Sequence, residues 1–312
     1  MKNSRPRGSS NRTRMMRIGV DLGGTKTESV LLDRNGKDIA RKRVNTPRND
    51  YAQIIQTIVE LVHEMEQLAQ TTCSIGVATP GALCTKSGLI KNANSTCLNG
   101  KALDLDLESA LRRPVRLAND ANCFALSEAI DGAGSHAEVV FGVILGTGVG
   151  GGVVINKNVL LGKNCIAGEW GHNPLPWPKN SEIPGPRCYC GRYGCIETFL
   201  SGPALTDAYD KLTGTKVTAK NIANSATHDD HARLALSDYA NRLARSLAQL
   251  INILDPDVIV LGGGLSNMKF LYDTIPVLWN TYIFSDHVVT ELKQNQHGDS
   301  SGVRGAARLW NE

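Results

Sequence analysis

Aromatic residues and long apolar runs are scarce in this sequence. Phe, Trp and Tyr make up 5% of its 312 residues, and no stretch of eighteen consecutive apolar residues occurs. A membrane-spanning helix needs about 20 such residues, so no membrane partner is expected. The first residues also lack the apolar segment of a secretory signal, which predicts a soluble, cytoplasmic protein. Hydrophobic residues (41%) and charged residues (21%) occur in ordinary globular proportions, which excludes a disordered or fibrous chain.

Excess positive charge is confined to the first fifteen residues. The net charge is +4, and without the five basic residues of this segment it becomes −1 (Lys2, Arg5, Arg7, Arg12 and Arg14). The rest of the chain has no basic stripe and few aromatic side chains for stacking on bases, so no nucleic-acid partner is expected. We interpret residues 1–15 as a disordered basic leader, ahead of a start at Met15 or Met16.

Disulfides are not expected among the eight cysteines, because without an export signal their thiols stay reduced. Five of them are single, in mostly apolar surroundings, and are predicted to be small buried hydrophobic residues (Cys73, Cys84, Cys97, Cys123 and Cys165). The other three form the pattern Cys188-x-Cys190-x4-Cys195, downstream of His172. One imidazole and three thiols are the ligand set of a closed, structural Zn²⁺ site; a redox dithiol or packed free thiols are the alternatives.

The order of elements predicts two α/β units that face each other across a cleft. Strands and an Asn35-Gly36 hairpin precede a helix over 50–69, and a similar strand–turn–strand pattern follows Pro114. We expect an N-terminal domain over 16–115 and a C-terminal domain over 116–301, with a zinc loop over 167–196. Helices are expected over 120–130, from 203 and over 231–253, and a short last helix, about 302–312, is expected to pack back onto the first domain.

Glycine is abundant, with 31 residues, and three glycine clusters each follow an apolar strand. Backbone N–H groups of such turns can bind an anion. The first cluster misses the P-loop spacing by one residue, and the second fits G-x-G-x-x-G but precedes a strand, whereas a dinucleotide fold needs a helix there. We therefore expect ATP phosphates between the first two turns and the nucleoside at the third. The predicted nucleotide and Mg²⁺ residues are Asp21, Gly23, Gly24, Thr25, Lys26, Gly146, Thr147, Gly148, Gly150, Gly262, Gly263 and Gly264.

Five acidic or amide side chains complete the candidate site. Asp21 follows the first strand, where a carboxylate beside phosphates needs a divalent cation between them. Asp120 is either an N-cap of the next helix or the base that accepts a hydroxyl proton during phosphoryl transfer. Asn119 could hold a sugar hydroxyl, while Glu169 and Glu197 flank the Cys-rich segment and suit vicinal hydroxyls. The metal is expected to order these two glutamates rather than to act as a Lewis acid.

Several motifs together resemble those of the ROK family of sugar kinases, from Met16 to Trp310. They are DLGGTKTE, ATPG, NANST, LANDANC, GTGVGGG, GEWGHNP, CYCGRYGCIETFLSG, DPDVIVLGGGLSN and HGDSSGVRGAA. The chain is most similar to bacterial fructokinases of the manno(fructo)kinase type. The resemblance implies an actin-like two-domain ATPase fold with a central cleft, closure on sugar binding and a homodimer. It also implies Asp120 as general base, zinc on His172, Cys188, Cys190 and Cys195, and a sugar site of Gly81, Asn94, Asn119, Glu169, His172 and Glu197.

The expected activity is Mg-ATP-dependent phosphorylation of fructose to fructose 6-phosphate, with mannose or glucose as poorer acceptors. The alternative is a ROK kinase of glucose, N-acetylglucosamine or N-acetylmannosamine, because the zinc and Asn-Asp motifs are shared among those enzymes. A sugar-sensing regulator is the third hypothesis. It is disfavoured because about sixteen residues precede the first strand, too few for a helix-turn-helix domain.

Overall fold

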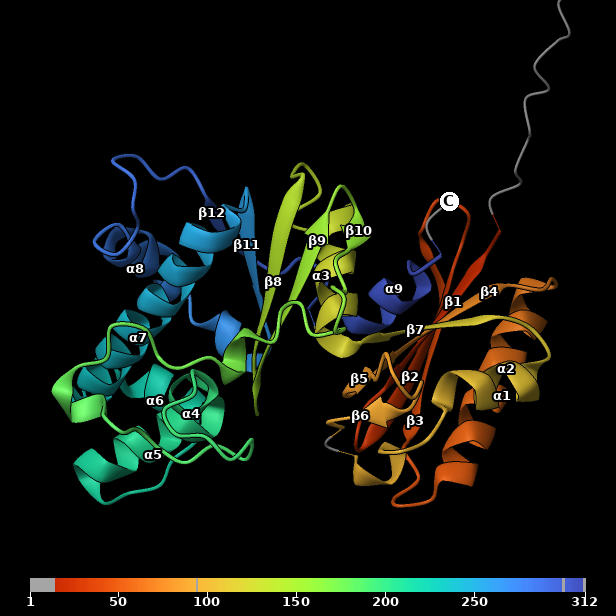
Figure 1. The fold of residues 1–312 in the computed structure, drawn as a ribbon, viewed down its shortest axis with the longest axis horizontal. Helices are drawn as coiled ribbons and strands as arrows, with labels where there is room; N and C mark the ends of the chain where they lie inside the picture. The colour runs from red at the N-terminus through yellow and green to blue at the C-terminus, as the bar shows by residue number, and fades with distance from the viewer. Residues whose placement is uncertain (1–14, 94, 299–300, 311–312) are drawn as a thin grey trace, which may run out of the picture.

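The protein consists of two halves, each built around a five-stranded mixed sheet (Figure 1). The computed structural model describes residues 15–93, 95–298 and 301–310. Within these ranges, none of the helices is long and apolar enough to cross a membrane. The cysteines form no disulfide: Cys73 and Cys123 are buried as predicted, whereas the other three single cysteines, Cys84, Cys97 and Cys165, are only half-buried.

The first sheet has the strand order β3-β2-β1-β4-β7. β1, β2 and β3 are antiparallel, and β4 and β7 join them in parallel. Helix α1 begins after Asp50, whose side chain accepts a hydrogen bond from the Gln53 N–H group, and it buries the predicted apolar stripe against the sheet. The bounds are β1 Arg17–Leu22, β2 Lys26–Leu32, β3 Asp38–Asn45, α1 Tyr51–Ala69, β4 Ser74–Thr79, β5 Ala82–Leu83, β6 Ile90–Lys91, η1 Thr96–Leu98, α2 Leu103–Leu111 and β7 Val115–Asn119.

The second sheet has the order β10-β9-β8-β11-β12, and helices cover the face that points away from the first half (Figure 1). β8 and β9 form the predicted glycine-turned hairpin, and β11 lies parallel to β8. The bounds are β8 Val139–Leu145, β9 Val149–Ile155, β10 Asn158–Val159, η2 Trp170–His172, η3 Asn180–Glu182, α4 Glu197–Leu200, α5 Gly202–Thr213, α6 Ala219–Ser225, α7 Asp230–Leu254, β11 Val258–Gly262, η4 Gly264–Asn267, α8 Phe270–Trp279 and β12 Glu291–Gln294.

Two helices cross between the sheets, α3 (Asp120–Asp131) and α9 (Ser301–Ala307). α3 follows β7 of the first sheet but packs on β8 and β9 of the second, while α9 packs on β1 and β4 of the first. The two helices approach closely at Gly305, where an added Cβ would lie 1.7 Å from the Cys123 carbonyl oxygen. Because β7 pairs with β4, the first sheet extends past residue 115 to Asn119.

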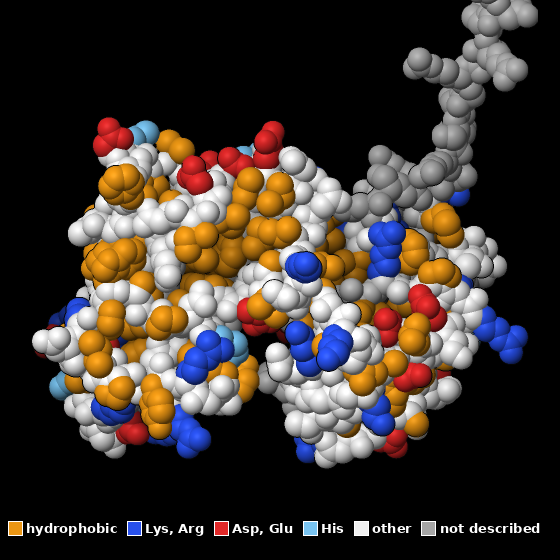
Figure 2. Space-filling view, viewed as in Figure 1, with side chains coloured by type: hydrophobic (Ala, Val, Ile, Leu, Met, Phe, Trp, Pro, Cys, Tyr) orange, Lys and Arg blue, Asp and Glu red, His pale blue; other side chains and the backbone are white. Residues whose placement is uncertain are grey.

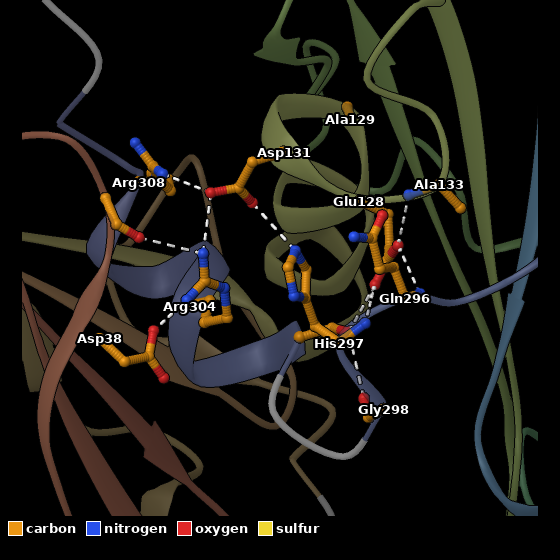
Figure 3. Close-up of polar contacts among 12 residues, drawn as sticks. Asp38, Glu128, Ala129, Asp131, Ala133, Gln296, His297, Gly298, Arg304 and Arg308 are labelled. Carbon is orange, nitrogen blue, oxygen red and sulfur yellow. Dashed lines mark hydrogen bonds and ion pairs between the residues drawn. The ribbon is translucent and has the colours of Figure 1, made fainter.

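Acidic residues of α3 anchor the segment that leads into α9 (Figure 3). Glu128 is fully buried, and its carboxylate accepts hydrogen bonds from the Gln296 N–H (3.0 Å) and the Ser301 hydroxyl (2.8 Å). Asp131 lies 3.0 Å from the His297 Nε2 atom and 2.8 Å from the Arg304 Nη2 atom. These bonds fix the crossing of the two helices, and with it the relative position of the two halves. The surface is indented between these halves, at the bottom of the view in Figure 2.

Candidate active site

The first glycine turn joins β1 to β2 as a tight, exposed hairpin turn. The Gly23 N–H donates to the Lys26 carbonyl (3.1 Å), and the Thr46 hydroxyl donates to the Gly23 carbonyl (2.8 Å). Gly24, Thr25 and Lys26 are exposed. This turn therefore presents backbone N–H groups to solvent, as a phosphate-binding turn requires.

The second glycine turn joins β8 to β9. The Gly146 N–H donates to the Gly148 carbonyl (3.0 Å), and the Gly146 carbonyl accepts from the Gly202 N–H at the start of α5 (2.7 Å). Gly150 follows inside β9, with its Cα facing the Ala121 side chain of α3. The turn is thus held between the N-terminal ends of two helices, where partial positive charge favours an anion.

The third cluster differs from the expectation. Gly262 is buried, and a Cβ there would lie 2.4 Å from the Phe124 ring. Gly263 has φ of 80° and packs against the Leu145 carbonyl. These two glycines allow α3 and β8 to approach β11, and only Gly264, which begins η4, faces open space.

A cavity of about 1130 Å³ lies beside the second and third turns. Gly146, Thr147 and Gly264 line it, together with α5, α6 and the residues that follow η4. Lys216, just before α6, and Lys220, within α6, are on its wall. Its size fits a nucleoside with its phosphates. The residues of α5 and α6 were missed by sequence reasoning, because ordinary helix residues without a glycine signal form this wall.

At the start of α3, the N-cap is Asn119 and not Asp120. The Asn119 side chain accepts from the Ala121 N–H (2.9 Å) and donates to the Gly81 carbonyl (3.2 Å). The hydrogen bond between them shows that the predicted residues Gly81 and Asn119 lie together. Gly81 has φ of 80°, and a Cβ on it would meet the Lys91 backbone. Asn94 lies outside the described residues.

Three carboxylates influence one another across the opening between the halves. Burial within the molecule raises the pKa of Asp120, and the charge of Glu169 raises it further, against the Ala121 N–H, which lowers it. The Asp120 side chain nevertheless keeps access to solvent. Burial, then Asp120, then Glu28 raise the pKa of Asp21 to about 7, with Arg43 opposing. Such crowding of negative charge suits a site that would receive Mg²⁺ with ATP, and Asp21 could supply a hard oxygen ligand.

Glu169 and Glu197 lie at the starts of short helical turns. Glu169 precedes η2, and Glu197 is the first residue of α4. The Glu197 Oε2 atom accepts a hydrogen bond from the Val149 N–H (2.8 Å), directly after the second glycine turn. Both glutamates act electrostatically on Tyr189, so they lie near the same group. The structure brings this pair next to the phosphate-binding turn.

His172, Cys188, Cys190 and Cys195 form one cluster, whose possible metal-binding atoms all lie within 4.8 Å of one another. The Cys190 and Cys195 sulfurs are 3.6 Å apart, and the Cys188 sulfur is 3.6 Å from His172 Nδ1. A tetrahedral ion with Zn–S bonds of about 2.3 Å separates its sulfur ligands by about 3.8 Å. The donor set and spacing therefore fit Zn²⁺, which would cross-link the loop and leave no open coordination position.

The thiols of this cluster differ in acidity. Burial raises the pKa of Cys195 to about 12, whereas the Arg192 N–H lowers the pKa of Cys190 to about 6. The other imidazole nitrogen of His172 lies 2.9 Å from the Tyr189 hydroxyl, and the two rings meet edge to face. This second contact fixes the orientation of the imidazole, a common property of metal-binding histidines.

The proline-rich loop has a second anchor that the sequence did not reveal. Arg245 of α7 donates to the Pro176 carbonyl (3.0 Å), and its Nη2 atom lies 2.9 Å from the Glu182 carboxylate. The side chains of Arg245 and Glu182 are 1% and 2% exposed. Arg242 adds a further bond to Glu182 (2.8 Å). The loop is therefore tied to α7 on one side of the Cys cluster.

Comparisons with a family model and with curated proteins both indicate a sugar kinase of the ROK family. The model of the ROK family matches residues 17–312. An N-acetyl-D-glucosamine kinase of Pectobacterium atrosepticum is 39% identical over 299 residues, which cover 94% of this chain and 98% of the relative.

Two solved structures are similar over almost the whole chain. A ROK hexokinase from Thermus thermophilus has a TM-score of 0.83 and 31% identity, covering 95% of this chain and 97% of its own. A ROK family glucokinase from Streptomyces griseus, in complex with glucose and AMPPNP, has a TM-score of 0.75 and 27% identity, covering 94% and 98%. The predicted actin-like two-domain ATPase fold is confirmed.

Proposed function

This chain belongs to the ROK family of sugar kinases, and we propose that it transfers the γ-phosphoryl group of ATP to the primary hydroxyl of N-acetyl-D-glucosamine. The acceptor is supported by the curated relatives, N-acetyl-D-glucosamine kinases that are 38–39% identical over nearly the full chain. The expectation of fructose as the main acceptor is therefore replaced by the alternative that the sequence left open.

The proposed mechanism assigns the proton transfer to Asp120. Asn119 is the N-cap of α3, whereas the Asp120 carboxylate accepts a hydrogen bond from the Ala121 N–H (2.8 Å) and its side chain is exposed to solvent. An ionised carboxylate there accepts the hydroxyl proton as the oxygen attacks the γ-phosphorus, and positioning with electrostatic stabilisation supplies the rest of the rate. The observation that carries the proposal is this solvent-exposed carboxylate, which lies close enough to Asp21 and Glu169 for their charges to interact.

The other predicted residues take binding roles in the proposal. The two glycine turns hold the phosphates, and the cavity between α5, α6 and η4 takes the nucleoside. Mg²⁺ that arrives with ATP would neutralise phosphate charge, and Asp21 would orient it. The acceptor is held by Asn119, Glu169, His172 and Glu197, with Gly81 and Asn94 beside them. Zn²⁺ on the Cys cluster would keep Glu169, His172 and Glu197 in place without entering the reaction.

Fructose stays as the second candidate acceptor because of Tyr189. The ring of this tyrosine stands 5.0 Å from the His172 ring, centroid to centroid, and its hydroxyl contacts His172. Glu169 and Glu197 act electrostatically on Tyr189, so a sugar held by these two residues and His172 would lie near its ring, and we propose that the ring disfavours a bulky acetamido substituent. Fructose has no such substituent, and the resemblance of the segment HGDSSGVRGAA to fructokinases favours it as well.

The acceptor is tested by measuring ADP release with Mg-ATP for N-acetylglucosamine, fructose, glucose, mannose and N-acetylmannosamine. The proposal predicts that N-acetylglucosamine has the highest kcat/KM. Fructose as the best acceptor would overturn that choice and leave the kinase assignment intact. No turnover with any of the five sugars would contradict kinase activity toward hexoses and favour the sugar-sensing hypothesis.

A further inference from the structure

The strand β9 has different neighbours along its two halves. β8 pairs with it from Val149 to Ile155, whereas β10 pairs only at Val154 and Ile155. Helix α3 approaches Gly150 and Gly152 in the glycine half of β9, while the segment 168–171 and Glu197 approach Val149, Gly150 and Gly151. The segment that carries the proposed acceptor residues thus lies directly against the strand that leaves the phosphate-binding turn.

The backbones of the segment 168–171 and of β9 are in very close contact. Gly168 has φ of 92°, and a Cβ on it would lie 2.4 Å from the Gly151 carbonyl oxygen. A Cβ on Gly171 would lie 2.2 Å from the Val149 carbonyl oxygen. Any side chain at these positions would force the segment away from β9. Because the backbones of the segment 168–171 and β9 are packed at this separation, a displacement of one would displace the other.

Trp170 completes the contact with a directed bond. It is 3% exposed, and its indole N–H donates to the Gly150 carbonyl (2.9 Å). The Phe141 ring of β8 meets the indole edge to face, with centroids 6.0 Å apart. Trp170 therefore packs over the hairpin while its sequence neighbour Glu169 faces the carboxylates of the active site.

Glu197 holds the adjacent backbone group. Its carboxylate accepts from the Val149 N–H, and Trp170 donates to the next residue, Gly150. Two consecutive residues of β9 are thus bound by side chains from the acceptor side. The turn of Gly146 and Thr147, which lines the nucleotide cavity, immediately precedes them.

We propose that Trp170 is a positioning residue which, with Glu197, sets the phosphate-binding turn from the acceptor side, so that sugar binding tightens nucleotide binding. The inference rests on the proposed function for the location of the two ligands, but not on which hexose is the acceptor. Neither the indole nor its hydrogen bond contacts ATP in this account. The effect passes through the backbone of β9.

The test is W170F, which removes the N–H donor and keeps an aromatic ring against Phe141. Binding of a non-hydrolysable ATP analogue is measured by calorimetry with and without the preferred sugar, beside KM for ATP, kcat, zinc content and Tm. Loss of one ordinary hydrogen bond corresponds to about a 3- to 10-fold weakening. We expect W170F to weaken the analogue by that factor and to reduce its tightening by sugar, with zinc content unchanged. The matched control W177F, on a half-exposed tryptophan of the same loop, should match the wild type.

A second pair of variants covers the case in which W170F does not fold. E197A removes the acceptor of the Val149 N–H, while E197Q keeps an oxygen there. Measured without sugar, E197A should weaken analogue binding several-fold and E197Q should restore it. A lower Tm with unchanged analogue binding and unchanged sugar coupling would overturn the inference. Wild-type protein that binds no ATP analogue would overturn the proposed function, and the inference with it.

Discussion

Neighbouring residues at the start of α3 have separate tasks. Asn119 is the N-cap and accepts from the Ala121 N–H, a role that stabilises a helix by about 1 kcal/mol. Asp120, one position later, has its carboxylate at the opening between the halves, close enough to Asp21 and Glu169 for their charges to interact. A carboxylate that is placed among other acids, with its pKa raised above the ordinary aspartate value, is suited to accept a proton.

The raised pKa of Asp120 predicts the pH dependence of turnover. Only the ionised carboxylate can act as a base, and its ionised fraction falls as pH is lowered through the pKa. Because burial and Glu169 raise that pKa, kcat/KM should begin to fall at a higher pH than an ordinary aspartate, with pKa of about 4, would give. A pH profile of kcat/KM at fixed Mg-ATP checks this.

The variant E169Q is the control for that profile. It removes the negative charge that contributes to the raised pKa, so the acidic limb should move to lower pH even if the rate is reduced. A profile that is flat down to about pH 4, or a limb that stays in place in E169Q, would show that Asp120 is not the titrating base.

At the scale of elements, the loop over 167–196 is held in two places. The Cys cluster closes one part, and Arg245 and Arg242 of α7 bind Glu182 in another. Burial raises the pKa of Glu182, but hydrogen bonds from Arg242, the Lys179 N–H and Arg245 outweigh it, and the net pKa is lowered. The ionised Glu182 side chain therefore stabilises the fold at pH values above the pKa of glutamate in the unfolded chain. This contribution is lost as pH falls through the lower pKa that Glu182 has in the folded protein.

E182A should destabilise the protein by about 3–5 kcal/mol, because it leaves the buried Arg245 guanidinium without its partner. Urea unfolding at pH 7 measures the loss. D238A is the matched control, since Asp238 pairs with Lys179 of the same loop at 3.3 Å but both side chains are exposed. D238A should lower the free energy of unfolding by less than about 1 kcal/mol. Equal losses for the two variants would contradict the second anchor.

Strong local signals explain which elements the sequence predicted. α1, the glycine hairpins and β11 follow from apolar periodicity, capping and turn residues, and they occur as predicted. β12 gave no signal, because its four residues are only partly buried and pair with β11 alone. α8 contains Pro276, which reads as a helix breaker, yet packing of Leu271, Ile275 and Trp279 in the core maintains the helix.

The candidate site was predictable where residue type limits the chemistry. The metal cluster needs imidazole and thiol ligands, and its four members lie together. The wall of the cavity proposed for the nucleotide, in α5 and α6, was not predictable, because apolar contact with a base can be made by many residue types. At Gly262, close packing against Phe124 explains the glycine without a nucleotide, so the sequence pattern alone could not distinguish the two reasons.

At the scale of the whole molecule, the crossing of α3 and α9 joins the two halves. Each helix follows a strand of one sheet and packs on the other, and the bonds of Glu128 and Asp131 hold the crossing (Figure 3). Burial raises the pKa of Asp131, but His297, Arg308 and Arg304 lower it more strongly. Closure of the halves on sugar binding, which the family resemblance implies, is an untested expectation. The homodimer that the family resemblance implies stays a prediction.

The central claim is that Asp120 acts as the general base in phosphoryl transfer from ATP to the primary hydroxyl of a hexose. Its most direct test is phosphorus NMR of the product made by wild type and by D120N with Mg-ATP and the best acceptor. We predict a hexose 6-phosphate from the wild type and a rate lower by about 10²–10⁴-fold in D120N, with sugar binding retained. Phosphate on another hydroxyl, inorganic phosphate alone, or normal turnover by D120N would contradict the account.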